Sequence, residues 1–376
     1  MPLSEEEIRR ILRKIEFDKT EPKLLVELVN RAIELGDGER RRVTRMKERC
    51  MRLLNLLKEN AIINTLKKDD SLVNSLRRAA TGALDGSFQV ISGYGGRYYT
   101  FIGLSIILAR EGFTVDPEVL LDGLIIPIEC SDESEANKKS SEIMLWCETR
   151  SLRGLAERLI GLESPFILLD GPIVDPPLLR NSSYVQCRTD NIKSCINRDV
   201  TVIGFVKRII GTEFMRFLQS TFNDEIDLSP FSNDLDLLTG ILYFASLQSK
   251  LPVYTTPFQP LDFLEKTDPL FMTYSQYDDF GVKIYQAYYK PNIRSKVYRI
   301  ELASTYSLYG EELRDKFEKI LTLINYVWTL PGMNQPLPIL LAHEKCSVRR
   351  GAAEKLYYEV ITRGLTEEEA YLWIQE

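Results

Sequence analysis

The sequence predicts an α/β protein in which a mixed sheet is flanked by helices and preceded by a helical N-terminal region. Residues 1–80 repeat apolar positions every three or four residues, which is the period of amphipathic helices. After residue 83, segments rich in aromatic and β-branched residues alternate with helical patterns. The sequence contains no internal repeat and no low-complexity linker. We therefore expect one domain over residues 81–376, with an α/β insertion around residues 175–335.

The composition is that of a globular protein. The 376 residues are 44% hydrophobic and 27% charged, which excludes wholesale disorder. Six scattered cysteines without metal-ligand spacing argue against a zinc site and a disulfide framework. The charged N-terminus and the lack of a long apolar run predict a cytoplasmic protein with no membrane partner. Because the net charge is −6, the chain could bind a nucleic acid only through a local basic patch and not through its overall charge.

The N-terminal region is expected to contain successive amphipathic helices. Ser4 and Glu7 form a capping box at the start of the first helix. Gly36 and Gly38 are expected to break the helical pattern, and a long helix rich in Arg and Lys follows over residues 39–60. Such a basic helix is either a solvated surface or a contact for a second copy, a partner protein or nucleic acid.

The next segment predicts three strands, a helix and a further strand. "SFQVIS" and "RYYTFIGLSIILA" flank the glycine-rich turn "GYGG" and predict a hairpin, and "LIIPIEC" predicts a third strand. The predicted helix covers residues 133–162, and the apolar strand "PFILLD" ends at Asp170. Later elements are predicted as strands over residues 200–209, 281–290 and 296–304 and helices over residues 234–246, 310–330 and 366–374. Residues 335–364 are predicted to form a loop followed by the last long helix.

Acidic residues fall at informative places along these elements. Asp85 in "ALDGSFQV" precedes the first strand, where an Asp-Gly pair usually marks only a turn. Asp170 directly follows a buried strand, at the edge where α/β sheets place their chemistry. Glu148 lies in the predicted helix, and His343 immediately precedes the last long helix. A helix packed over two neighbouring parallel strands would bring the three carboxylates together.

Such an oxygen cluster suits the hard cations Mg²⁺ and Mn²⁺. One or two ions would activate water and stabilise a leaving oxygen in phosphodiester hydrolysis. His343, as a further ligand or a proton carrier, favours Mn²⁺ over Mg²⁺. Lys207 could neutralise charge that develops on the phosphate, and Gly86 and Ser87 would leave room beside Asp85 for metal and phosphate.

The sequence resembles the NurA nucleases over residues 80–360. Four blocks carry the resemblance, in the order typical of that family: "DGSFQVISGYGGRYYTFIGLSIILA", "CETRSLRGLAERLIGLESPFILLDGPI", "VIGFVKRI" and "QPLPILLAHEKCSV". It implies a ribonuclease H-like core and a Mn²⁺-dependent deoxyribonuclease acting on DNA ends, as a 5′–3′ exonuclease and single-strand endonuclease. It also implies a homodimer and a HerA-type hexameric ATPase as partner in DNA end resection during double-strand break repair.

The resemblance also assigns residues to roles. It places the metal ligands at Asp85, Glu148, Asp170 and His343 and the catalytic lysine at Lys207. Glu142 is the alternative to Glu148, and because residues six apart point about 120° apart around a helix, only one of the two can face the cluster. The chain departs from the family at Gln335, where a tyrosine is common, and Asp234 could be a further functional acid.

Two other interpretations stay open. The chain could be a non-catalytic dimeric scaffold for the ATPase, or another ribonuclease H-like enzyme that cleaves junctions or hybrids. Interleaved basic and aromatic residues could guide single-stranded DNA, although aromatic residues in strands more often pack a sheet. The predicted DNA contacts are Arg97, Arg294, Lys296 and Arg299.

Overall fold

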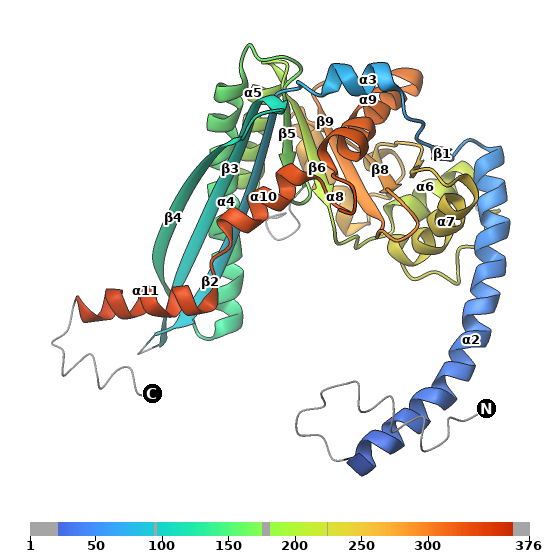
Figure 1. Cartoon of the computed structure of the whole chain (residues 1–376), viewed down its shortest axis with the longest axis horizontal. Coiled ribbons are helices and arrows are strands. Elements are labelled where there is room, and N and C mark those ends of the chain that lie inside the picture. Colours follow the sequence, from blue (N-terminus) through green and yellow to red (C-terminus); the bar gives the residue numbers. More distant parts are fainter. Residues whose placement is uncertain (1–21, 94–95, 175–180, 224, 364–376) are drawn as a thin grey trace. The chain divides into compact units, whose positions relative to one another are not determined.

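The computed structural model describes residues 22–93, 96–174, 181–223 and 225–363 (Figure 1). The chain divides into two compact units, residues 1–60 and residues 61–376, which we describe separately. The predicted capping box at Ser4 and the predicted helix over residues 366–374 lie outside the described residues.

The described residues of the first unit form the long helix α2 (Pro22–Glu59). The expected break at Gly36 and Gly38 is wrong, because the helix passes through both glycines without interruption. A glycine in a helix costs only about 1 kcal/mol relative to alanine, and strong helix formers surround these two. The side chains of Leu24, Leu28 and Leu35 are exposed along this helix.

The second unit is built on one mixed sheet with the order β1-β7-β8-β9-β6-β5-β2-β3-β4 (Figure 1). Strand β2 pairs in parallel with β5, and β5 with β6, whereas the other neighbouring pairs are antiparallel. The strands are β1 (Ile63–Thr65), β2 (Thr81–Ser92), β3 (Arg97–Phe113), β4 (Glu118–Glu129), β5 (Phe166–Leu169), β6 (Thr201–Val206), β7 (Val253–Thr255), β8 (Lys283–Lys290) and β9 (Tyr298–Ser304).

Helices cover both faces of this sheet. Alternate residues of β5 belong to different apolar cores: Ile167 and Leu169 pack with α4, α5 and α8, whereas Phe166 and Leu168 pack with α3, α9 and α10. The helices are α3 (Asp70–Leu76), α4 (Glu133–Leu159), α5 (Ser182–Ile196), α6 (Glu213–Thr221), α7 (Asp234–Ser249), α8 (Pro269–Asp279), α9 (Gly310–Thr322), α10 (Leu337–Cys346) and α11 (Arg350–Thr362), with a 3₁₀ turn η3 (Pro260–Asp262) and a π-helical turn η4 (Leu323–Trp328).

The predicted ribonuclease H-like mixed sheet flanked by helices is confirmed. The stretch expected as an insertion, residues 175–335, supplies strands β6 to β9 of the same sheet. Asp85 lies within β2 and not ahead of it, and His343 lies inside α10, a separate helix that precedes α11. Among the described residues, no helix is long and apolar enough to cross a membrane.

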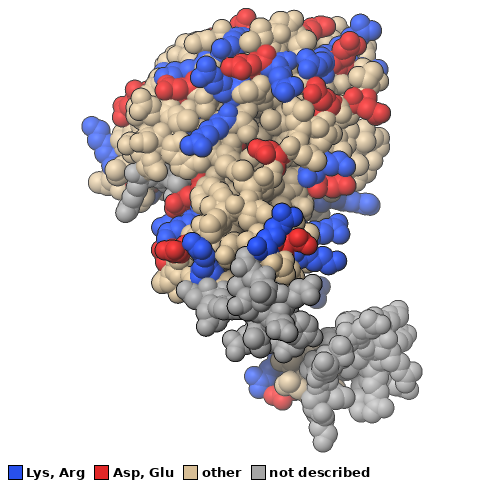
Figure 2. Space-filling model, turned by 90° about the vertical axis from the view of Figure 1, so that its left-hand side faces the viewer, with Lys and Arg blue, Asp and Glu red and all other residues tan. Residues whose placement is uncertain are grey.

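Strand β4 forms one edge of the sheet. Four of its apolar side chains, Val119, Leu121, Leu124 and Ile125, are exposed. Figure 2 shows a broad uncharged area on this side of the molecule. A long, apolar edge strand can pair with a strand of another chain.

Candidate metal centre

Parallel pairing of β2 and β5 brings two aspartates together. Leu84 of β2 lies opposite Leu169 of β5, so that Asp85 and Asp170 occupy the next positions in register. The Asp170 backbone N–H donates to the Leu84 carbonyl oxygen at 3.3 Å, which extends the pairing to the aspartate. Both side chains are buried, at 8% and 4% exposure. The predicted position of Asp170 after a buried strand is thus what places it beside Asp85.

His343 completes the group from α10. Its Nδ1 lies 2.9 Å from Asp85 Oδ2 and 3.8 Å from Asp170 Oδ2. One potential ligand atom of each of the three residues lies within 4.8 Å of the others. The His343 side chain is 63% exposed, so the group is open to solvent on the histidine side.

Small residues on β2 and β3 hold α10 over the aspartates. Ser105, opposite Asp85 on β3, donates its hydroxyl to the Ala342 carbonyl oxygen at 2.7 Å. Ser87 donates to the Cys346 carbonyl oxygen at 2.5 Å. A Cβ atom added to Gly103 would lie 2.2 Å from that same carbonyl oxygen. These residues set the position of His343.

The expectation that Ser87 leaves room for metal and phosphate is corrected by these contacts, because its hydroxyl holds the end of α10. It also accepts a hydrogen bond from the Val348 backbone N–H at 3.0 Å. Ser105 and Gly103 carried no recognisable motif, and sequence reasoning missed them. Their contacts with α10 span more than 200 residues of sequence.

Glu148 lies near this group but does not join it. Successive residues of a strand face opposite sides of a sheet, so Gly86 faces α4 whereas Asp85 faces α10. A Cβ atom added to Gly86 would lie 2.7 Å from Glu148 Oε1. The absence of a side chain at Gly86 therefore gives room to the glutamate. This placement supports Glu148 over Glu142 as the acid of α4 next to the site.

Lys207 follows β6, the strand next to β5. Its Nζ lies 2.6 Å from Asp170 Oδ2 and forms an ion pair with it. The other oxygen, Asp170 Oδ1, is buried and has no hydrogen-bond partner among the described residues. One oxygen of this buried carboxylate is therefore available to a ligand.

The charges of the two aspartates oppose each other. Burial, followed by the negative charge of Asp170, raises the pKa of Asp85 to about 6, although hydrogen bonds from His343 and Cys346 act in the other direction. A divalent cation between the carboxylates would remove this repulsion. Two carboxylates, one of which has an unpartnered buried oxygen, and an imidazole are a donor set that fits Mn²⁺ or Mg²⁺.

The predicted DNA contact at Arg299 is wrong. This residue of β9 is buried, and its guanidinium forms ion pairs with Glu213 at 3.2 Å and Glu301 at 2.8 Å. Arg294 and Lys296 are exposed in the turn between β8 and β9. Arg97 is exposed at the start of β3, 3.6 Å from Glu129.

The buried side chain of Asp234 is hydrogen-bonded within the fold. Its buried carboxylate accepts hydrogen bonds from the backbone N–H groups of Phe214 and Met215 at 2.9 and 3.0 Å, and from the Tyr288 hydroxyl at 2.6 Å. Burial, followed by the charge of Glu213, raises the pKa of Asp234 to about 7. These contacts hold the start of α6 against β8 and account for the acid without a catalytic role.

The model of a protein family described as "NurA domain" matches residues 79–348 of the chain. This range covers most of the chain and all residues of the metal centre. The chain belongs to the NurA family. The resemblance of the four sequence blocks is thereby confirmed. A comparison with curated protein sequences finds no significant match.

A solved NurA nuclease structure shares the fold. The NurA nuclease from Sulfolobus solfataricus has a TM-score of 0.58 and 14% identity, over 92% of this chain and 97% of that chain. A second structure, described as NurA, has a TM-score of 0.42 and 15% identity, over 89% of this chain and 99% of that chain. The former shows that the NurA fold extends over nearly the whole chain.

Proposed function

We propose that the protein is a metal-dependent deoxyribonuclease that hydrolyses phosphodiester bonds at DNA ends. Following the NurA resemblance, we also propose 5′–3′ exonuclease and single-strand endonuclease activity, with Mn²⁺ as the preferred ion. The observation that carries the proposal is the group of Asp85, Asp170 and His343, whose ligand atoms lie within 4.8 Å of one another beside Lys207. The decisive experiment is Mn²⁺-dependent degradation of end-labelled single- and double-stranded DNA by the wild type and by aspartate variants.

Each residue has a separate task in this proposal. Asp85, Asp170 and His343 hold the cation, with Glu148 as a predicted further ligand. The cation, when bound, supplies an activated water and charge stabilisation at the leaving oxygen. Lys207 forms an ion pair with Asp170 and presents a positive charge to a phosphate oxygen. Asp85 orients the His343 ring through Nδ1.

The position of α10 gives a test of this geometry. We expect Gly103→Ala to reduce DNA hydrolysis by about a hundredfold, because the added methyl group collides with the Cys346 carbonyl oxygen and displaces His343. The measurement is the rate of Mn²⁺-dependent DNA degradation.

Gly123→Ala is the matched control for this change. Gly123 lies directly opposite Gly103 on β4, and an added Cβ there meets no atom closer than 3.9 Å. Equal activity of the two variants would show that α10 is not positioned by this contact.

We further propose that DNA and a HerA-type hexameric ATPase are the partners, in DNA end resection for double-strand break repair. The exposed Arg97, Arg294 and Lys296 are the proposed DNA contacts. The cytoplasmic location also stays a prediction. Wild-type protein that is inactive both with and without the ATPase would instead favour the non-catalytic scaffold, and preferential cleavage of junctions or hybrids would favour another ribonuclease H-like enzyme.

We propose a homodimer that pairs through β4. An edge strand can pair antiparallel with its own copy about a twofold axis, and the exposed apolar side chains of β4 suit such a contact. Leu121→Lys should therefore convert the dimer to a monomer in light scattering. Ile210→Lys, which replaces an apolar side chain that is 81% exposed outside the sheet, should leave the dimer intact. A dimer that persists in Leu121→Lys would reject this interface.

A further inference from the structure

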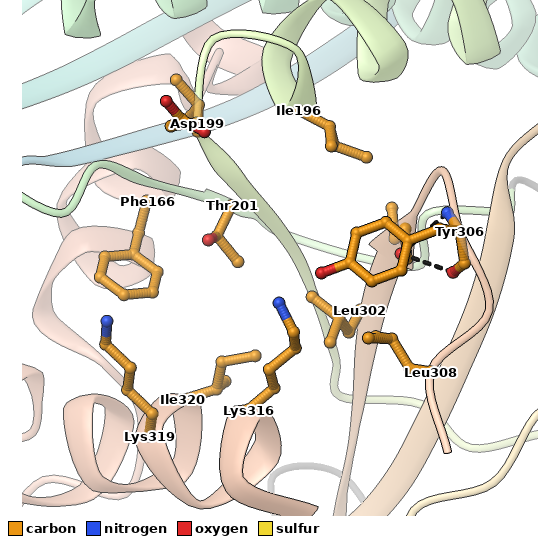
Figure 3. A pocket seen from close by; sticks show the side chains of 13 residues that line it. Phe166, Ile196, Asp199, Thr201, Leu302, Tyr306, Leu308, Lys316, Lys319 and Ile320 are labelled. Atoms are coloured by element: carbon orange, nitrogen blue, oxygen red, sulfur yellow. Dashed lines mark hydrogen bonds between the residues drawn. The ribbon is translucent and has the colours of Figure 1, made fainter. Parts of the chain in front are cut away.

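A pocket of about 280 Å³ lies at the end of β5 and β6 opposite the metal centre (Figure 3). Phe166 and Thr201, the first residues of these strands, line it, whereas Asp170 and Lys207 follow the other ends. At about 3.3 Å per residue, roughly 13 Å of strand separate Phe166 from Asp170. The volume is slightly below the range of about 300–1,000 Å³ that is usual for small-molecule sites, and indicates a small ligand.

Two lysines of α9 point into this pocket (Figure 3). Lys319 Nζ lies 5.6 Å from the centre of the Phe166 ring, and Lys316 Nζ lies 5.5 Å from the centre of the Tyr306 ring. Within the part of the chain that the structure describes, neither ammonium group forms an ion pair. Like charges three residues apart on a helix repel each other. An anion between them would remove this repulsion.

The remaining walls combine apolar and polar groups. Ile196, Leu302, Leu308 and Ile320 supply apolar surface. Tyr306 is held at the rim because the Ser304 hydroxyl donates to its carbonyl oxygen at 2.8 Å and accepts from its N–H at 3.2 Å (Figure 3). A ligand that fits this lining has a charged end and a larger organic part.

Asp199 is the carboxylate that lines the pocket, and Figure 3 shows it across the pocket from the two lysines. Its side chain is exposed. Its carboxylate can accept a hydrogen bond from a hydroxyl or amino group on the organic part of a ligand. The pocket therefore offers opposite charges at its two sides.

We propose that this pocket binds a small phosphate monoester, with its phosphate between Lys316 and Lys319 and its organic part against Phe166 and Leu302. A phosphate monoester carries a charge of about −1.5 to −2 at pH 7, which matches the two ammonium groups. A carboxylate would neutralise only one of them. This site is separate from the metal centre, and the proposal does not depend on hydrolysis of DNA.

Isothermal titration calorimetry of the full chain in EDTA tests this site. The probes are deoxyadenosine monophosphate, deoxyadenosine and inorganic phosphate, and all proteins carry Lys207→Gln so that binding beside Asp170 is suppressed. We expect the monophosphate to bind more tightly than either other probe. The double variant Lys316→Gln/Lys319→Gln should weaken its binding at least tenfold, and Arg314→Gln, an exposed change elsewhere on α9, should leave it unchanged.

A second variant tests the site without altering its charge. Ile196→Trp fills the apolar side of the pocket and should also weaken binding of the monophosphate at least tenfold. Thermal unfolding identifies any variant that does not fold. The proposal is overturned if no probe binds, if inorganic phosphate binds as tightly as the monophosphate, or if both pocket variants bind like the Arg314→Gln control.

Discussion

Asp170→Asn is expected to lower Mn²⁺-dependent DNA hydrolysis by at least about a hundredfold while the fold is retained. The asparagine has the same shape but removes the charge that pairs with Lys207 and that would hold the cation. A bound metal contributes several kcal/mol of transition-state stabilisation, and about 1.4 kcal/mol corresponds to a factor of ten in rate. Asp85→Asn should have a similar effect, because Asp85 contributes the neighbouring carboxylate and orients His343.

Calorimetric titration with Mn²⁺ distinguishes a variant that no longer binds the metal from one that binds it but hydrolyses DNA slowly. Asp190→Asn, a change of an exposed aspartate on α5, is the control and should retain activity and metal binding. Full activity in either Asp170→Asn or Asp85→Asn would reject the assigned metal centre. Comparison of Glu148→Gln with Glu142→Gln decides which acid of α4 takes part.

Arg299→Met is expected to destabilise the protein by about 3–5 kcal/mol. The change leaves the carboxylates of Glu213 and Glu301 buried without the cation between them. The free energy of unfolding, measured with urea, should fall accordingly. Arg294→Met, an exposed change in the preceding turn, should alter it by less than about 0.5 kcal/mol.

A combined variant tests the cause of this effect. Arg299→Met with Glu213→Gln and Glu301→Gln removes both unpaired charges, and much of the lost stability should return. The Ile173 backbone N–H, which donates to Glu301 Oε2 at 2.7 Å, can still donate to a glutamine carbonyl oxygen. If Arg299→Met is as stable as the Arg294→Met control, the buried ion pairs do not stabilise the fold.

Local patterns predicted the central part of the fold. The hairpin of β2 and β3, the helix α4 and the buried strand before Asp170 all follow from periodicity over short windows. Arg299 was misjudged because strand β9 is buried on both faces. In such a strand a basic residue must be paired inside the protein, and its partner Glu213 lies 86 residues away in sequence.

The sequence indicated the acids of the candidate site but not the residues that hold α10 in place. The types and positions of Asp85, Asp170 and His343 indicated a metal, and the NurA resemblance assigned roles to these residues and to Lys207. The docking of α10 on Ser87, Gly103 and Ser105 depends on contacts between distant segments, which no local pattern encodes. The same limit hid the position of Glu148, which lies beside Gly86.

The hydrogen bond between Asp85 and His343 joins residues 258 positions apart. Synthesis of that length of chain takes roughly 10–50 s at about 5–20 residues per second. During this interval a nascent chain already holds β2 but lacks α10, and so the centre has no histidine. The group of Asp85, Asp170 and His343 is therefore complete only after the C-terminal helices have left the ribosome and docked.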